Sequence, residues 1–241
     1  MNVQQQAAFY DLVWARGHLW KPQAWPEWSI IAPHVLDAPR RLEIGAGLRP
    51  RLPVRDTLFA DVSSVALARL QRHGGVPLLT SADQLPLADR SLDIVAACEV
   101  LEHLENDQAA FAEIARVLSM GGLFFFSVPL QAALWTAHDV LAGHFRRYEP
   151  RTLIDTLAAH GFRVECFSPG VEQGYAPLKA IGAKVYGRFP LAAMWLEDRL
   201  IMPLGARAQK AIRQREPSIP PDTQAPSAFI ACRRIESSHS S

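Results

Sequence analysis

The sequence predicts an α/β fold, a mostly parallel sheet with crossover helices, and three observations support that prediction. Short apolar runs alternate with helical stretches or turns along the first two thirds of the chain. The first run, Arg41–Ile44, stops in the two-glycine turn Gly45-Ala46-Gly47. Carboxylates follow successive strands at Asp61, Asp83 and Glu99. In open α/β sheets the carboxyl ends of the strands form the ligand-binding edge, so these groups predict a binding site there.

Seven apolar segments are the predicted strands. Five of them alternate with helices or turns, as expected for parallel strands joined by crossovers. The last two lie on either side of a long insertion and complete the sheet. The predicted strands are Arg41–Ile44, Thr57–Ala60, Val76–Leu79, Leu92–Ala97, Leu123–Val128, Phe162–Phe167 and Ala228–Cys232.

Three helices are predicted between these strands from their caps and apolar periodicity. Ser63–Arg72 begins at a serine N-cap, at position 63 or 64. Asp107–Met120 carries apolar residues in i, i+3, i+4, i+7 register and is followed by a glycine pair that predicts its end. Pro150–His160 is stopped by Gly161.

We interpret residues 1–241 as a single domain with two additions to the regular alternation. Residues 1–39 hold four of the six tryptophans and form an aromatic N-terminal cap, which serves either as a lid, with Tyr10 or Arg16 near the bound ligand, or as packing over the sheet edge. Residues 40–168 form the binding core, and 227–235 the last strand. The insertion 169–226 contains a predicted amphipathic helix, Leu191–Gln214, and a proline-rich linker.

The composition fits a globular protein of the cytoplasm. The 241 residues are 49% hydrophobic and 20% charged, enough for a substantial core. The formal net charge of +1 gives no global field for nucleic acid, so no nucleic-acid partner is expected. Three cysteines without CxxC spacing indicate a reducing compartment. We find neither a signal peptide nor a run of roughly 18 apolar residues that a membrane span requires.

The glycine turn predicts a site for a nucleotide-type cofactor. Glycine has no Cβ, so Gly45 and Gly47 tolerate positive φ and let a bound adenosyl group approach the backbone. Glu43 either accepts hydrogen bonds from the ligand or fixes the turn. Asp61, at the end of the second strand, is placed to accept both hydroxyls of a ribose. Asp83 could accept the exocyclic amine of an adenine, with its neighbours near the ring.

Four motifs in order give the chain a specific resemblance to the class I S-adenosylmethionine-dependent methyltransferases, of the methyltransferase type 11-like family. The resemblance covers about residues 40–168 and resumes near 228–233. The motifs are Leu42-Glu43-Ile44-Gly45-Ala46-Gly47, Ala82-Asp83-Gln84-Leu85-Pro86-Leu87-Ala88-Asp89-Arg90-Ser91-Leu92-Asp93, Glu99-Val100-Leu101-Glu102-His103-Leu104 and Ala115-Arg116-Val117-Leu118-Ser119-Met120-Gly121-Gly122.

The resemblance implies a Rossmann-like sheet of seven strands in the order 3-2-1-4-5-7-6, with strand 7 antiparallel and helices on both faces. It also implies that S-adenosyl-L-methionine is the cofactor. The glycine turn would line the methionine portion, Asp61 the ribose, Asp83 and its neighbours the adenine, and Cys98–Val100 the sulfonium side. The full set of expected cofactor-binding residues is Glu43, Gly45, Ala46, Gly47, Asp61, Val62, Ala82, Asp83, Gln84, Leu85, Cys98, Glu99 and Val100.

The segment after the glycine turn departs from common patterns in two ways. A nicotinamide- or flavin-binding fingerprint would have a third glycine at position 50, where this chain has Pro50, so an oxidoreductase is disfavoured. The segment Leu48–Pro53 is bounded by proline, so the first helix after the turn is expected to be short or distorted.

The expected catalytic residues are His103, Glu102 and His144. Methyl transfer from a sulfonium needs alignment more than acid or base help, but an alcohol or phenol acceptor benefits from a base. His103 is the first candidate for that base; the alternative is that residues 101–104 only cap and pack a helix. His144 lies in Gly143-His144-Phe145-Arg146-Arg147-Tyr148, which would contact the acceptor or form a basic surface loop.

The spacing of Glu99, Glu102 and His103 leaves a metal-dependent alternative open. On a helix these side chains share one face, and His144 could add a fourth ligand, which resembles metal-assisted O-methyltransferases. Glutamate followed by histidine is also common in relatives that bind no metal, and the prediction is therefore that no metal is bound.

The predicted function is methylation of a small-molecule or lipid-linked acceptor, with oxygen as the expected target atom. The insertion carries basic residues interleaved with aromatic and apolar ones, so contact of residues 171–216 with an anionic membrane is one interpretation and a solvated basic face is the other. The alternative to an enzyme is a methyltransferase-like domain that binds the cofactor or a partner without catalysis.

Overall fold

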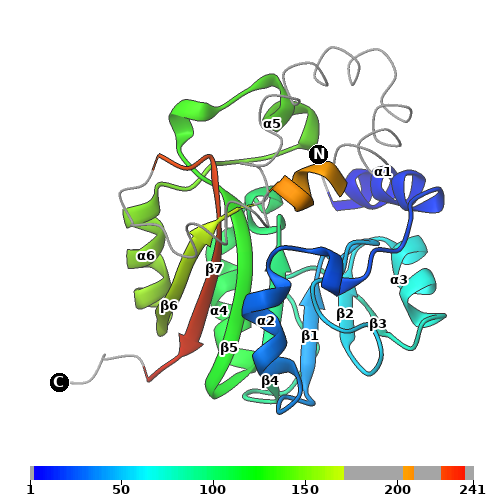
Figure 1. Ribbon diagram of the computed structural model, residues 1–241, viewed down its shortest axis with the longest axis horizontal. Coiled ribbons are helices and arrows are strands. Elements are labelled where there is room, and N and C mark those ends of the chain that lie inside the picture. The colour runs from blue at the N-terminus through cyan, green and yellow to red at the C-terminus, as the bar shows by residue number, and fades with distance from the viewer. Residues whose placement is uncertain (1–2, 171–202, 209–223, 237–241) are drawn as a thin grey trace.

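The computed structural model of the chain describes residues 3–170, 203–208 and 224–236. A seven-stranded sheet in the order β3-β2-β1-β4-β5-β7-β6 forms its centre (Figure 1). Strands β1 to β5 pair in parallel, whereas β7 pairs antiparallel with both β5 and β6. The predicted strand order and the antiparallel strand 7 are therefore confirmed.

All seven predicted strands are present. Glu43 on β1 lies opposite Phe59 on β2 and Ala96 on β4, so β1 is a central strand and its carboxyl end faces the middle of the sheet edge. The strands are β1 (Arg41–Ile44), β2 (Leu58–Asp61), β3 (Val76–Leu79), β4 (Leu92–Cys98), β5 (Leu118–Pro129), β6 (Phe162–Pro169) and β7 (Ser227–Arg234).

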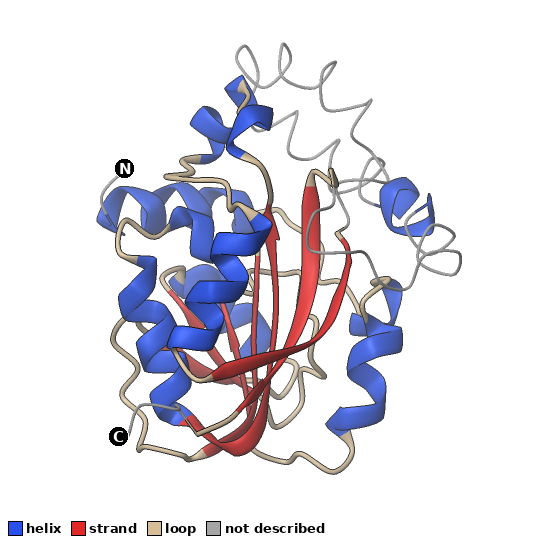
Figure 2. Ribbon diagram, turned by 90° about the vertical axis from the view of Figure 1, so that its left-hand side faces the viewer, coloured by secondary structure: helices blue, strands red, loops and turns tan. Residues whose placement is uncertain are grey.

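Helices lie on both sides of this sheet (Figure 2). The α-helices are α1 (Val3–Ala15), α2 (Trp28–Val35), α3 (Ser64–Gln71), α4 (Asp107–Val117), α5 (Ala137–Ala142) and α6 (Pro150–Ala159). Short 3-10 helices are η1 (Pro22–Ala24), η2 (Leu101–His103) and η3 (Ala132–Leu134). Among the described residues, no helix is long and apolar enough to cross a membrane.

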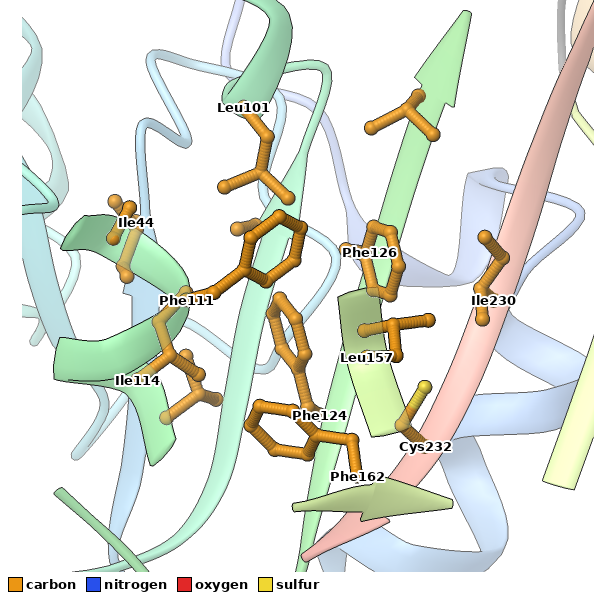
Figure 3. Packing of buried hydrophobic residues seen from close by; sticks show 14 of the residues in the cluster. Ile44, Leu101, Phe111, Ile114, Phe124, Phe126, Leu157, Phe162, Ile230 and Cys232 are labelled. Carbon is orange, nitrogen blue, oxygen red and sulfur yellow. The ribbon is translucent and has the colours of Figure 1, made fainter. Parts of the chain in front are cut away.

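The larger core lies between the sheet and helices α4 and α6. Phe111 of α4 packs against Phe126 of β5, and Phe124 stacks on Phe126 with ring centroids 4.6 Å apart. Leu157 of α6 and Phe162 of β6 close the cluster on the β7 side (Figure 3). Burial of such aromatic side chains is the main favourable contribution to folding and holds the strands in register.

The opposite face of the sheet is covered by α2 and α3. Ile31 of α2 packs with Phe125 of β5 and Phe229 of β7, while Leu67 of α3 packs on Phe59 of β2. Odd-numbered residues of β5 face this side and even-numbered ones face α4, as the alternation of side chains along a strand requires. Both faces of the central strands are therefore buried.

The predicted helix Asp107–Met120 is wrong at its end. Helix α4 stops at Val117, and β5 begins at Leu118, whose backbone is extended with φ −74° and ψ 134°. Leu118 pairs with Leu92 of β4 and is fully buried. The apolar spacing matched a helix because Leu118 enters the same core as α4. Apolar periodicity therefore does not distinguish helix from strand at Leu118, and its pairing with β4 does.

The other two predicted helices are confirmed. Ser63 is the N-cap of α3, and its hydroxyl accepts a hydrogen bond of 3.1 Å from the Ala66 N–H. Pro150 begins α6, as its missing N–H permits at a first helical position. Of the predicted helix Leu191–Gln214 the structure describes only residues 203–208, which are helical. The rest of the insertion segment 171–216 lies outside the described residues.

Candidate active site

The glycine turn after β1 needs glycine for two separate reasons. Gly45 and Gly47 have φ values of 62° and 52°, in the left-handed region that side chains disfavour. A Cβ on Gly45 would lie 2.6 Å from Val100 Cγ2, and one on Gly47 would lie 2.3 Å from Trp14 Cζ2. The turn is thus strained for any other residue and is closely approached from both sides.

Glu43 fixes the turn from inside the protein. Its carboxylate accepts hydrogen bonds from the backbone N–H groups of Arg51, at 2.8 Å, and Leu52, at 2.9 Å. Burial raises the pKa of Glu43 to about 7, although these two N–H groups and the Arg51 charge act in the opposite direction. Residues 45–57 contain no helix, in line with the short or distorted helix expected after this turn.

Asp61, at the end of β2, links the glycine turn to α3. One carboxylate oxygen accepts from the Gly47 N–H at 3.0 Å and the other from the Ser63 N–H at 2.8 Å. The side chain is buried, and this burial raises its pKa. The Val62 backbone is a third hydrogen-bond donor to this carboxylate. A carboxylate has about four acceptor directions, so Asp61 could still accept from a ribose hydroxyl while keeping these contacts.

Helix α1 covers this part of the site. The Asp11 carboxylate accepts from Ser63 Oγ at 2.6 Å and from the Val65 N–H at 3.2 Å. Arg69 of α3 donates to the carbonyls of Trp14 and Gly17. The pKa of Tyr10 is raised, first by burial and then by the negative charges of Glu102 and Asp61. Tyr10 therefore lies near both carboxylates. The sequence leaves two roles open for the segment that carries Tyr10, a lid over the ligand or packing over the sheet edge.

The segment after β3, expected at the adenine, is held by helix α4. Ala82 and Leu85 are buried, Asp83 is half-buried and Gln84 is exposed. The Leu85 N–H donates to Glu113 at 2.9 Å, and Arg116 donates to the Leu85 carbonyl at the same distance. The Asp83 carboxylate accepts from Ser81 Oγ.

The end of β4 differs from the expectation at Glu99. This residue has a φ of 56°, and its carboxylate accepts from Ser127 Oγ of β5 at 2.6 Å. Glu99 is therefore not on a helix with Glu102 and His103, which lie in the separate 3-10 turn η2. The shared helical face predicted for the three residues does not form, because the left-handed backbone at Glu99 turns its side chain toward β5.

Glu102, His103 and His144 do come together. Glu102 Oε1 lies 3.9 Å from His103 Nε2 and 4.0 Å from His144 Nε2, and its side chain is fully buried. The two imidazoles meet edge to face with centroids 4.7 Å apart. Burial, and then the neighbouring His144, lower the pKa of His103 to about 3. One carboxylate and two imidazoles is a donor set that divalent transition metals accept, with ligand atoms all within 4.8 Å of one another.

Three other residues of the His144 loop, Arg146, Arg147 and Tyr148, form polar contacts within the protein. Arg147 donates from Nε and Nη2 to Asp139, at 2.9 and 3.1 Å. Tyr148 donates from its hydroxyl to Asp107 at 2.7 Å, and Arg146 forms an ion pair with the same carboxylate at 2.5 Å. The expectation of a basic surface loop is wrong for Arg147 and Tyr148, whose polar groups hold the loop to α4 and α5.

Sequence reasoning missed Asp139. This fully buried carboxylate accepts a hydrogen bond from His144 Nδ1 at 2.9 Å. It also accepts from the N–H and hydroxyl of Thr136, at 2.8 and 2.9 Å, which makes a capping box at the start of α5. The available signal was the spacing Thr136-Ala137-His138-Asp139, which is typical of such a box.

Known proteins resemble this chain in sequence and in fold. The methyltransferase domain family matches residues 44–126. A probable S-adenosylmethionine-dependent methyltransferase of Mycolicibacterium smegmatis is 37% identical over 96 residues, which cover 39% of this chain and 35% of that protein. A malonyl-[acyl-carrier protein] O-methyltransferase of Laribacter hongkongensis is 32% identical over 177 residues, covering 62% of this chain and 60% of that protein.

The likeness to solved structures extends to the whole fold. The [4+2]-cyclase SpnF superimposes with a TM-score of 0.58 at 18% identity, covering 96% of each chain. The strand order is that of the class I methyltransferase fold. In sequence, residues 44–126 match the methyltransferase domain family, and the chain is similar to S-adenosylmethionine-dependent methyltransferases over part of its length.

Proposed function

We propose that this protein transfers a methyl group from S-adenosylmethionine to an oxygen atom of a small-molecule or lipid-linked acceptor. The observation that carries the proposal is the contact between the glycine turn and Val100, where a Cβ on Gly45 would lie only 2.6 Å from Val100 Cγ2. Val100 directly precedes η2, which holds Glu102 and His103. The cofactor turn and the polar cluster thus occupy one edge of the sheet, as donor and acceptor sites must.

The residues of this edge fit the cofactor by their chemistry. The turn of Gly45, Ala46 and Gly47 lets a ligand approach the backbone, and Asp61 has acceptor capacity for a ribose. The half-buried Asp83 beside buried Ala82 and Leu85 suits an adenine. Val62, Gln84, Cys98, Glu99 and Val100 complete the proposed binding surface. The backbone contacts of Glu43 favour a role in shaping the turn over direct contact.

The protein's task in this reaction is chiefly alignment. When bound, the cofactor supplies a methyl group on a sulfonium, whose departure leaves a neutral thioether. The chain has to hold an acceptor oxygen in line with that methyl group and keep water out, which the buried edge and helix α1 would do. An oxygen acceptor that starts as a hydroxyl also needs a group to take its proton, and His103, Glu102 and His144 are the proposed catalytic residues.

The names of two relatives and the cluster of Glu102, His103 and His144 both favour an oxygen acceptor. The relatives in Laribacter hongkongensis and in Methylococcus capsulatus are named malonyl-[acyl-carrier protein] O-methyltransferases, and each match covers about three fifths of both proteins. Both names specify an oxygen acceptor carried by a larger molecule. A buried imidazole pair with a carboxylate fits transfer to oxygen, because it offers a base in a site shielded from water.

The alternative function is a methyltransferase-like protein that binds the cofactor or a partner without methylating anything. The fold alone does not decide between the two, because SpnF has this fold and is a [4+2]-cyclase. The polar cluster favours an enzyme, since a binding module does not require a buried carboxylate between two imidazoles.

The test is transfer of an isotope-labelled methyl group from S-adenosylmethionine, followed by mass spectrometry. The acceptors are malonyl-loaded acyl carrier protein, small phenols and carboxylic acids, and lipid-linked phenols. We expect labelled ester or ether in at least one class and none with Asp61→Ala. Saturable binding of S-adenosylhomocysteine without transfer to any class would instead support the non-catalytic alternative.

A further inference from the structure

The imidazole of His144 is held between two buried carboxylates on different elements. Asp139 of α5 lies 2.9 Å from His144 Nδ1, and Glu102 of η2 lies 4.0 Å from His144 Nε2. The side chains of Asp139 and Glu102 are fully buried, and that of His144 is 6% exposed. The His144 backbone N–H also donates to the Asp139 carbonyl at 2.9 Å, so the two residues are joined by two hydrogen bonds.

The contacts of Asp139 determine which ring nitrogen of His144 bears hydrogen. Burial alone raises the pKa of Asp139, but hydrogen bonds from Arg147 and Thr136 outweigh it and lower the pKa to about 2. Asp139 is therefore ionised and acts only as an acceptor. His144 Nδ1 must then be the N–H donor, and in the neutral ring Nε2 carries the lone pair. That lone pair is directed to the side where Glu102 and His103 lie.

His144 is better suited than His103 to take a proton. Protonation of His103 would place a charge beside a second imidazole in a buried site, and its pKa is lowered to about 3 by burial and by His144. Protonation of His144 would place the charge between Asp139 and Glu102, which stabilise it. The order of candidates expected from the sequence, with His103 first, is thereby reversed.

We propose that Asp139 is a positioning residue that sets the tautomer of His144, so that His144 Nε2 acts as the base in methyl transfer. The inference rests on the proposed function. His144 Nε2 takes the proton of the acceptor hydroxyl, and the acceptor oxygen bonds to the methyl carbon. The bond from that carbon to sulfur breaks, and its electron pair stays on sulfur. The resulting imidazolium pairs with Asp139 until it releases the proton to solvent.

The charged and titratable groups around His144 come from three segments. Glu102 and His103 face it from η2, and the His103 ring lies edge to face against it. His138 and Asp139 face it from α5, with the His138 ring centroid 6.3 Å away. Arg147 donates from Nε to Asp139 Oδ1, the same oxygen that contacts His144 Nδ1. Asp139 has a hydrogen bond of 2.9 Å to His144 Nδ1, so its removal should change the His144 ring directly.

The decisive variant is Asp139→Asn. Its amide can donate to Nδ1, which favours the tautomer with hydrogen on Nε2 and withdraws the lone pair from the acceptor side. Thr136→Ala is the matched control, because it removes one hydroxyl contact to Asp139 and the side-chain cap of α5 while keeping the contact of Asp139 to His144. Loss of structure at α5 alone would affect both variants.

The experiment is nitrogen-15 NMR of histidine-labelled protein with S-adenosylhomocysteine bound, with His144 assigned by His144→Gln. We expect hydrogen on Nδ1 in the wild type and in Thr136→Ala. In Asp139→Asn we expect hydrogen on Nε2 and a lower pKa of His144. Hydrogen on Nε2 in the wild type, or an unchanged ring in Asp139→Asn, would overturn the assignment of Asp139.

A kinetic arm uses a small or lipid-linked phenol as acceptor, because a phenol hydroxyl has a proton for the base to remove, whereas a malonyl carboxylate is already ionised. In Asp139→Asn we expect kcat to fall by roughly 10²–10³-fold with KM nearly constant, and the acidic limb of the pH profile to move to lower pH. An unchanged kcat and limb would overturn the base role of His144. Absence of turnover in the wild type with this and the other acceptor classes would instead contradict the proposed function, and the NMR result would still decide whether Asp139 sets the tautomer.

Discussion

The indole of Trp14 lies against Gly47 so closely that a Cβ at position 47 would sit 2.3 Å from Trp14 Cζ2. Trp14 belongs to α1 and Gly47 to the turn after β1, so this contact joins the N-terminal cap to the centre of the sheet edge. On the other side of the same turn, Gly47 donates its N–H to Asp61. The turn is thus closed between α1 and β2, and a cofactor bound there would lie beneath α1.

Gly47→Ala should destabilise the protein and weaken cofactor binding. The added methyl group meets the Trp14 ring, and alanine is strained at a φ of 52°. We expect a loss of about 2–4 kcal/mol in the free energy of unfolding, measured by urea denaturation. Gly121→Ala is the matched control, because Gly121 has a φ of 79° and no atom within 4 Å of its Cβ position. Equal losses in the two variants would show that the Trp14 contact contributes nothing.

Asp11→Ala should loosen α1 without unfolding the sheet. It removes the acceptor for Ser63 Oγ and the Val65 N–H, which tie α1 to the start of α3. In hydrogen exchange we expect faster exchange of the α1 amides, and in the wild type we expect S-adenosylhomocysteine to slow it. Gln4→Ala, at an exposed position of the same helix, is the control. If the ligand leaves α1 exchange unchanged in the wild type, α1 is packing and not a cover of the cofactor site.

The buried carboxyl of Glu43 should make stability depend on pH. Its folded-state pKa of about 7 lies above the ordinary value of 4.5, so folding favours the protonated form. Its contribution to stability is complete below about pH 4.5 and is lost as the pH rises through about 7. The wild type loses this contribution as the pH rises, whereas Glu43→Gln has no such group to lose. The unfolding free energy of Glu43→Gln minus that of the wild type should therefore increase by at most about 3 kcal/mol from acid to neutral pH. If the unfolding free energies of the two proteins changed equally with pH across this range, the burial of the Glu43 carboxyl would be contradicted.

Methyl transfer should not require a divalent metal ion. If Asp139 holds the proton on His144 Nδ1, then Nε2 has to be available for the acceptor proton, and a metal at Glu102, His103 and His144 would occupy it. We expect turnover and S-adenosylhomocysteine affinity to survive dialysis against a chelator. The contrary result is loss of turnover that zinc or manganese restores in the wild type but not in Glu102→Gln.

The sheet could be predicted from the sequence because its strands are short apolar runs with clear stops. The turn at Gly45-Ala46-Gly47 and the carboxylate Asp61 were identified for the same reason, since their positions follow from strand ends. The end of α4 could not be predicted, because Leu118 is buried equally well by a helix or by a strand. Only its pairing with Leu92 across the sheet separates the two.

The cluster of Glu102, His103 and His144 was less predictable, since it depends on backbone conformation and distant contacts. The spacing of Glu99, Glu102 and His103 fits one helical face, but the left-handed backbone at Glu99 breaks that face. The approach of His144 to Glu102 depends on the loop after α5, whose Phe145 N–H donates to the Glu102 carbonyl at 2.8 Å. No local pattern in the sequence encodes such a contact.

The most direct test of the account is calorimetric titration of S-adenosylhomocysteine into the wild type and into Asp61→Ala. We expect saturable binding at one site in the wild type. In the variant we expect binding weaker by about 1–3 kcal/mol, because a charge-assisted acceptor for the ribose is lost. Absence of binding in the wild type, or equal affinity in the two proteins, would contradict the assignment of this sheet edge as the cofactor site.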